Sequence, residues 1–178
     1  MLSAMSGSPL ATVGLAARSL LWTVLLPGFF AGYVPWRWFG LGAVRFEPGS
    51  LAHWAGALLI GTGIVLLAAC IWEFAHRGRG TLSPLDPPRR LVVEGAYRHV
   101  RNPMYLAVTL IVLGEVLLGA DRGLLWFWLA WFAAANAFVL GYEEPALRRQ
   151  FGASYEHYAR EVGRWVPRLR PYRSTADL

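Results

Sequence analysis

The sequence lacks lysine entirely, contains one cysteine, Cys70, and has charged side chains at only 16% of its 178 residues. A single cysteine excludes an internal disulfide and a zinc site built from cysteines. Soluble domains carry about 25% charged residues, so this chain is unusually poor in charge. It is also 56% hydrophobic, with a mean hydropathy of +0.38. Such a composition excludes a disordered chain, and the length fits one domain over residues 1–178.

Long apolar stretches dominate the chain. A helix that crosses a bilayer needs about 20 mostly apolar residues, with a range of about 17–25. Buried helices of a soluble bundle would show a polar face every 3.6 residues, and Leu58–Ile71 and Leu124–Phe138 have none. We therefore predict an all-α integral membrane bundle with four transmembrane helices, at about Ala11–Val34, Leu51–Phe74, Met104–Ala120 and Leu124–Tyr142.

The connections between these stretches predict two further features. Only Asp121-Arg122-Gly123 separates the third stretch from the fourth, so these two helices form an antiparallel hairpin. After the fourth stretch, apolar residues recur every three or four positions from Leu147 to Trp165. This spacing predicts an amphipathic C-terminal helix with a break near Gly152. The helix either lies in the lipid interface or folds back over Ala75–Pro103.

All 17 basic residues are arginines, and their placement predicts the orientation. Six lie in Ala75–Pro103 and seven follow the fourth stretch, so two segments on the same side of the membrane hold most of the positive charge. The positive-inside rule makes this side, and both termini, cytoplasmic. The basic charge is thus explained by topology, and we expect no nucleic-acid partner.

The segment from His76 to Tyr105 is rich in glycine and proline, which forbid a long helix before Arg89. A connection as long as His76–Tyr105 is uncommon in a compact domain, and such long connections usually have a function. Asn102-Pro103 marks the start of the third helix, whose first-turn N–H groups suit a carboxylate. The alternative is a structured loop with an ordinary helix cap.

Glu143-Glu144-Pro145 places two carboxylates at the cytoplasmic end of the fourth helix. Acidic residues this close to the membrane core are costly and often functional, and two together favour a cationic ligand. The alternative is a solvated helix end, or pairing with Arg148 and Arg149.

Other polar residues carry weaker signals. Glu73 and His76 share a helix face and either line a site or mark a helix end. We expect Glu115 to snorkel toward the outer surface and Asn136 to make an interhelical hydrogen bond. Cys70 is expected to be inert packing, and the four scattered histidines predict no metal site.

Two separated motifs resemble one family. Gly95–Tyr105 is similar to the GxYxxxRxPxY signature of the isoprenylcysteine carboxyl methyltransferase family, to which the phospholipid N-methyltransferases are related. The family's C-terminal signature resembles Glu143-Glu144-Pro145 followed by Leu147, Phe151-Gly152, Tyr155, Tyr158 and Pro167. The similarity covers about Gly78–Arg168, roughly half of the chain.

This resemblance implies an integral membrane enzyme that uses S-adenosylmethionine in a pocket facing the cytoplasm, and takes its acceptor from the bilayer. It implies Arg101, Asn102 and Glu144 as catalytic residues. Two departures stand out: the family's eukaryotic enzymes have His in place of Asn102 and a basic residue in place of Val139. The implied cofactor-binding residues are Arg89, Arg90, Leu91, Val92, Tyr97, Asn102, Pro103, Met104, Tyr105, Glu143 and Glu144.

The chemistry of these residue types agrees with that cofactor. Glu143 and Glu144 suit the sulfonium and ammonium, while Arg101 or the helix start at Pro103 suits the carboxylate. Tyr97 and Tyr105 offer rings and hydroxyls for the adenosine. Because the methyl donor is already activated, catalysis can rest on positioning and desolvation, and no general base is assigned.

The sequence does not identify the methyl acceptor, which is a lipid-borne carboxylate, a phospholipid amine, a thiol or another small lipophile. The lack of lysine and the abundance of arginine and alanine suggest a bacterial cell-membrane protein, which disfavours a prenylated protein substrate. One alternative is an NADPH-dependent membrane reductase of the steroid or sterol type, although the Glu143-Glu144 pair would repel the cofactor's 2′-phosphate. The other is a non-catalytic membrane scaffold.

Overall fold

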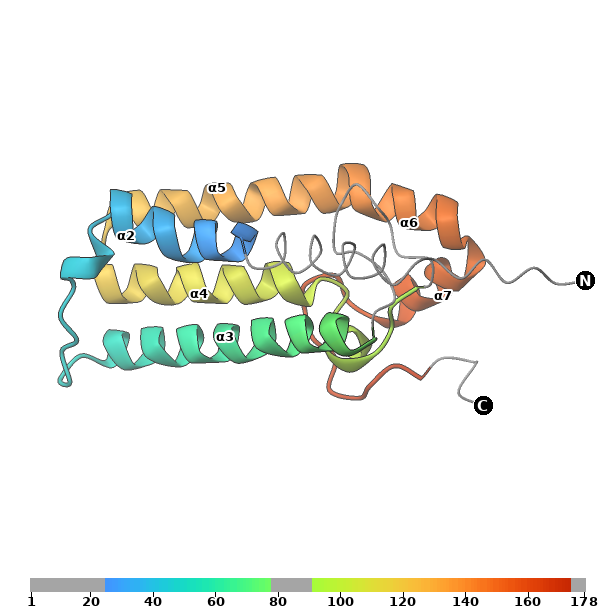
Figure 1. The fold of residues 1–178 in the computed structure, drawn as a ribbon, viewed down its shortest axis with the longest axis horizontal. Coiled ribbons are helices and arrows are strands. Elements are labelled where there is room, and N and C mark those ends of the chain that lie inside the picture. The colour runs from blue at the N-terminus through green and yellow to red at the C-terminus, as the bar shows by residue number, and fades with distance from the viewer. Residues whose placement is uncertain (1–24, 78–90, 174–178) are drawn as a thin grey trace, which may run out of the picture.

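The computed structural model describes residues 25–77 and 91–173. Within these ranges the chain is helical, without any β-strand, which confirms the all-α class. Figure 1 shows α3, α4 and α5 running alongside one another, with α7 at the end of the bundle opposite the α4–α5 turn. The helical elements are η1 (Phe29–Tyr33), α2 (Val34–Trp38), η2 (Leu41–Ala43), α3 (Leu51–Arg77), η3 (Gly95–Arg98), α4 (Pro103–Gly119), α5 (Arg122–Phe138), η4 (Val139–Glu143), α6 (Glu144–Phe151) and α7 (Ala153–Glu161).

Two helical runs are long and apolar enough to cross a membrane. Leu51–Glu73 has 23 residues, and an 18-residue stretch within it has a mean hydropathy of 2.2; Arg122–Phe151 has 30 residues, and the corresponding stretch has a mean of 1.7. In each, only 17% of the apolar window is buried inside the protein. A core helix of a soluble protein would be mostly covered, so these exposed apolar surfaces are suited to lipid.

The four-span count is not established by the structure. The second and fourth predicted spans correspond to α3 and to the run from Arg122 to Phe151. The third corresponds to α4, whose 17 residues reach about 26 Å, a little less than the roughly 30 Å of a bilayer core. The first, Ala11–Val34, lies mostly outside the described residues.

Helix α4 is the buried centre of the bundle, and glycines bring it against α3. A Cβ atom added at Gly56 would lie 2.7 Å from the carbonyl oxygen of Gly114, and one at Gly63 would lie 2.7 Å from that of Ala107. Backbones can approach this closely only through small residues, a common packing mode of membrane helices. The same helix buries Glu115, which is only 5% exposed, so the expectation that it snorkels is wrong.

The predicted hairpin of the third and fourth helices is confirmed. Only Ala120 and Asp121 separate α4 from α5, and Ala120 takes a left-handed conformation with φ 48°. The Asp121 carboxylate accepts a hydrogen bond from the backbone N–H of Leu124 at 2.8 Å and so caps α5. The turn is tighter than predicted, because Arg122 and Gly123 already belong to the helix.

The C-terminal part folds back on the bundle. Gly152, with φ 50°, separates α6 from α7, as predicted, but α7 ends at Glu161, so an amphipathic helix continuing to Trp165 is wrong. Of the two predicted arrangements, the fold-back over the loop is the one observed. The apolar side of α7 and the residues after it form a small core with the loop, composed of Tyr155, Tyr158, Val162, Tyr172, Leu91 and Val93.

Candidate active site

Glu144 is the centre of a buried charge cluster. Its side chain is only 3% exposed, and Arg164 donates to both of its oxygens, from Nε to Oε1 at 2.6 Å and from Nη2 to Oε2 at 3.1 Å. Arg101 Nη1 lies 3.0 Å from Oε1, and Arg148 Nη2 lies 3.6 Å from Oε2. Both carboxylate oxygens are therefore engaged by guanidinium groups of the protein itself.

Glu143 has very different surroundings. Its carboxylate accepts a hydrogen bond from the Tyr105 hydroxyl. The oxygen Oε2, however, is buried and has no hydrogen-bond partner among the described residues. Glu143 is the last residue of the π turn η4, two residues before Pro145 in α6. Proline lacks the N–H that a regular helix would use here, and the π turn absorbs this mismatch. The turn thus presents Glu143 at a point where the helix is irregular.

Tyr97 lies in the same region and links it to α3. Burial of its hydroxyl raises the pKa of Tyr97 well above the ordinary tyrosine value, and the nearby Cys70 and Glu143 raise it further. The Tyr97 backbone carbonyl accepts a hydrogen bond from the Tyr158 hydroxyl at 2.7 Å. Tyr97 of η3 and Tyr105 of α4 therefore lie near Glu143, and Tyr158 of α7 joins them through the Tyr97 carbonyl.

Gly95 is required where the loop meets the end of α3. Its φ of +55° is a left-handed conformation, and a Cβ atom there would lie 2.5 Å from Oε1 of Glu73. The glycine thus lets η3 close against the Glu73 carboxylate, so Glu73 adjoins the site rather than marking a free helix end. The side chain of His76, predicted with it, lies outside the described part of the structure.

Residues 163–172, here called the C-terminal strap, cover the segment 98–102. The backbone N–H of Arg101 donates to the Gly163 carbonyl at 2.9 Å, and that of Arg168 donates to the His99 carbonyl at 2.9 Å. The side-chain amide of Asn102 donates to the Arg164 carbonyl at 3.3 Å. The strap therefore holds the predicted helix start at Asn102 in place from outside.

Trp165 extends from the strap to the hairpin. Its indole N–H donates to Oδ1 of Asn136 at 3.0 Å, and its ring lies 5.3 Å from that of Phe132 and 6.5 Å from that of Tyr105. The prediction that Asn136 makes an interhelical hydrogen bond is thus wrong, because its partner, Trp165, lies in the strap and not in a helix. Sequence periodicity counted Trp165 as part of a helix face and gave no signal of this contact.

The structure brings most of the predicted site residues together at one end of the bundle. Tyr97 and Tyr105 lie beside the buried carboxylate of Glu143, while Arg101 and Glu144 form the adjoining ion cluster. Asn102, Pro103 and Met104 start α4. Leu91 packs on the α7 core, and Val92 lies beside it in the loop. Arg89 and Arg90 lie outside the described residues. Within those residues, no three metal-ligating side chains gather.

This arrangement defines a class: a helical membrane protein whose buried carboxylate, tyrosines and ion cluster meet at one end of the bundle. The model of the phospholipid methyltransferase family matches residues 51–154, more than half of the chain. The protein belongs to this family, and is thereby a membrane methyltransferase in general terms. No curated protein and no solved structure matches the chain. The match runs from α3 into α7 and stops before the strap.

Proposed function

We propose that this protein transfers a methyl group from S-adenosylmethionine to a lipophilic or small acceptor that it takes from the bilayer. The acceptor offers a carboxylate, an amine or a thiol. The observation that carries the proposal is the buried Oε2 of Glu143, which lacks a hydrogen-bond partner among the described residues. A buried carboxylate oxygen without a donor is costly, and a bound cation would remove that cost.

A second buried atom has the complementary chemistry. Nε of Arg101 also has no hydrogen-bond partner among the described residues, although Nη1 is held by Glu144. One unpartnered acceptor and one unpartnered donor, on residues joined through Glu144, suit a zwitterion. The amino-acid end of S-adenosylmethionine is such a group, with its ammonium for Glu143 and its carboxylate for Arg101.

The other predicted residues receive roles from their surroundings. Tyr97 and Tyr105 would contact the adenosine, with Asn102, Pro103 and Met104 beside them at the start of α4. Glu144, whose oxygens are already bound by arginines, would act as a positioning residue that orients Arg101 and fixes the strap. When bound, S-adenosylmethionine supplies an activated methyl group. The protein's contribution is then to orient the acceptor and to exclude water, for which Trp165, Phe132 and Tyr105 provide an aromatic cover.

The same proposal places the site at the cytoplasmic side of a bacterial cell membrane. Among the described residues, the opposite end of the bundle carries only Arg37, Arg45 and Arg122. The end that holds Glu143 carries the remaining arginines, which the positive-inside rule assigns to the cytoplasm.

The direct test is calorimetric titration of the detergent-purified protein with S-adenosylmethionine, with NADPH as a parallel ligand. We expect saturable binding of S-adenosylmethionine, lost in Glu143→Gln and kept in Glu47→Gln, an exposed glutamate used as the matched control. Binding of NADPH alone would assign the site to a reductase. Binding of neither ligand by a folded protein would contradict the proposal and favour a scaffold role.

A further inference from the structure

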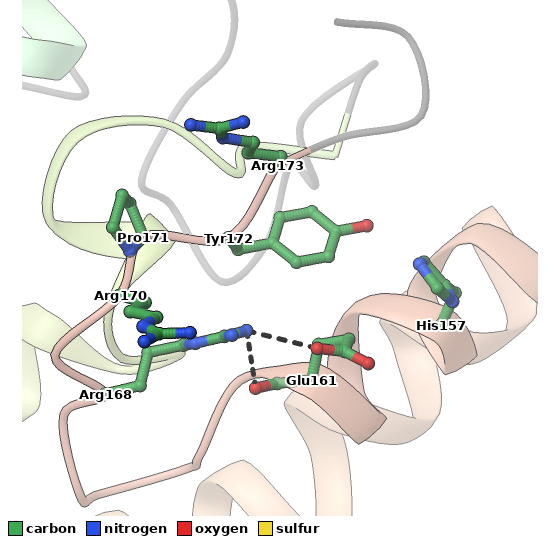
Figure 2. A pocket seen from close by; sticks show the side chains of 7 residues that line it. All are labelled: His157, Glu161, Arg168, Arg170, Pro171, Tyr172 and Arg173. Atoms are coloured by element: carbon green, nitrogen blue, oxygen red, sulfur yellow. Dashed lines mark hydrogen bonds and ion pairs between the residues drawn. The ribbon is translucent and has the colours of Figure 1, made fainter. Parts of the chain in front are cut away.

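A cavity of about 560 Å³ lies between α7 and the end of the strap. Figure 2 shows His157 and Glu161 on the α7 side, and Tyr172 with its ring directed between the strap and α7. None of its lining residues belongs to the Glu143 site. The complete lining is His157, Glu161, Arg168, Arg170, Pro171, Tyr172 and Arg173.

The cavity has an excess of positive charge. Arg168 is engaged by Glu161, with Nη1 at 3.3 Å from Oε2 and at 2.9 Å from the backbone carbonyl. Arg170 and Arg173 make no ion pair with any residue that the structure describes. Two guanidinium groups are thus left without a counter-charge at one cavity. Guanidinium groups bind phosphate oxygens through paired hydrogen bonds, so a phosphate is the ligand that this charge suits.

The cavity is connected to the end of the apolar helix α3 through η3. Tyr172 exchanges two hydrogen bonds with Arg98: its N–H donates to the Arg98 carbonyl at 2.9 Å, and Arg98 Nε donates to its carbonyl at 2.7 Å. Arg98 ends η3, whose Gly95 packs against Glu73, the last residue of the apolar span. A short chain of contacts, from Tyr172 through Arg98 and Gly95 to Glu73, therefore connects the cavity to the end of the apolar span.

Two exposed apolar side chains distinguish lipid from free phosphate. Val166 is 77% exposed and Leu169 is 97% exposed, and both alternate with the arginines along the strap. A leucine left almost completely in water contributes nothing to folding, but it contributes to binding when it enters the acyl boundary beside basic residues.

We propose that this cavity binds the phosphate of an anionic phospholipid, with Arg170 and Arg173 on the phosphate and Leu169 and Val166 in the adjoining acyl region. The bound lipid is a ligand of the strap and is not the methyl acceptor, since the cavity shares no residue with the Glu143 site. Lipid binding at this cavity is independent of methyl transfer at the Glu143 site, because the two sites have no residue in common.

The test titrates the purified protein in neutral detergent with phosphatidylglycerol, phosphatidylcholine or inorganic phosphate, and follows the melting temperature to obtain an apparent Kd. We expect phosphatidylglycerol to stabilise the protein and the other two to have little effect. Each arginine near an anionic lipid contributes about fivefold, so Arg170→Gln with Arg173→Gln should weaken binding about 30-fold. The exposed pair Arg149→Gln with Arg160→Gln, at the same end but not among the residues that line the cavity, is the matched control.

Every outcome bears on the proposal. A Kd for phosphatidylglycerol that is unchanged in the Arg170/Arg173 variant, or equally weakened in the control, would overturn the site. Equal stabilisation by inorganic phosphate would overturn the assignment to lipid. The single variants Arg170→Gln and Arg173→Gln, each expected to lose about fivefold, keep the test decisive if the double variant does not fold. Leu169→Ser should weaken phosphatidylglycerol binding without changing the melting temperature in its absence.

Discussion

Glu143 and Glu144 are neighbours in the chain, yet their surroundings are opposite. Three arginines approach Glu144, so both of its oxygens are engaged within the protein. Glu143 has a tyrosine hydroxyl on one side and an unpartnered buried oxygen on the other. The two adjacent carboxylates thus differ in role: Glu144 holds the C-terminal part in place, whereas Glu143 keeps an oxygen without a hydrogen-bond partner among the described residues. Residue type and adjacency alone do not reveal such a difference.

The largest effect is expected for Glu144→Gln. This change leaves Arg101 and Arg164 facing a neutral amide in a buried place, and losing one partner of a buried ion cluster costs about 3 kcal/mol or more. The melting temperature in detergent should fall strongly. In contrast, Glu156→Gln removes only the exposed partner of Arg148 and should change it little. Equal melting temperatures for the two variants would show that the cluster is not essential to the fold.

The next effect concerns the Tyr105–Glu143 contact. Tyr105→Phe removes the hydroxyl that Glu143 uses, and an unsatisfied buried carboxylate oxygen costs about 1–3 kcal/mol. A double-mutant cycle with Glu143→Gln should therefore yield a coupling energy of about 1 kcal/mol or more. The cycle is measured on stability and on S-adenosylmethionine affinity. Strict additivity in both would mean that the two residues act separately.

A smaller effect is expected for the strap's contact with the hairpin. Trp165→Phe keeps an aromatic ring but removes the five-membered ring of the indole together with the N–H that binds Asn136, which should cost about 1–2 kcal/mol for the hydrogen bond. Adding Asn136→Leu removes the orphaned amide and should recover part of that loss. Trp126→Phe, at a residue that is 70% exposed, is the control and should have no comparable effect. Failure of Asn136→Leu to recover stability would argue against the hydrogen bond.

The smallest expected effect is at Tyr158, which donates to the Tyr97 carbonyl. Tyr158→Phe should cost about 1 kcal/mol. Burial raises the pKa of Tyr158 above its ordinary value, so the folded protein keeps this proton when the unfolded chain loses it. Stability should therefore decline as the pH rises above about 10, and Tyr158→Phe should reduce that decline. An alkaline melting profile identical in the variant and the parent would contradict this assignment.

Local patterns predicted the features that depend on neighbouring residues. The apolar run from Leu51 predicted α3, the short link after α4 predicted the hairpin, and Gly152 predicted the break before α7. The two motifs also singled out Tyr97, Tyr105 and Glu143, which lie near one another, while the role of these residues in cofactor binding stays a prediction. These signals are local, because helix length, turn chemistry and a left-handed glycine act within a few positions.

Contacts between distant segments could not be predicted in this way. Arg148 was a predicted neighbour of Glu144, but the closer partners are Arg101 and Arg164, far away in the sequence. Asn136 gave no sign that a tryptophan of the strap would reach it. Both outcomes depend on how the chain after Gly152 folds back over residues 98–102, and an amphipathic pattern is equally compatible with lying in lipid.

The glycine contacts between α3 and α4 also have a consequence for motion. Backbones that touch at Gly56, Gly63 and Gly114 leave no room for side chains to rearrange, so the two helices should behave as one rigid body. Between α4 and α5, by contrast, large aromatic side chains such as Phe127 and Trp131 fill the contact and can change rotamer. An opening that admits a molecule from the bilayer is therefore expected at the α5 side, while the α3 side stays closed.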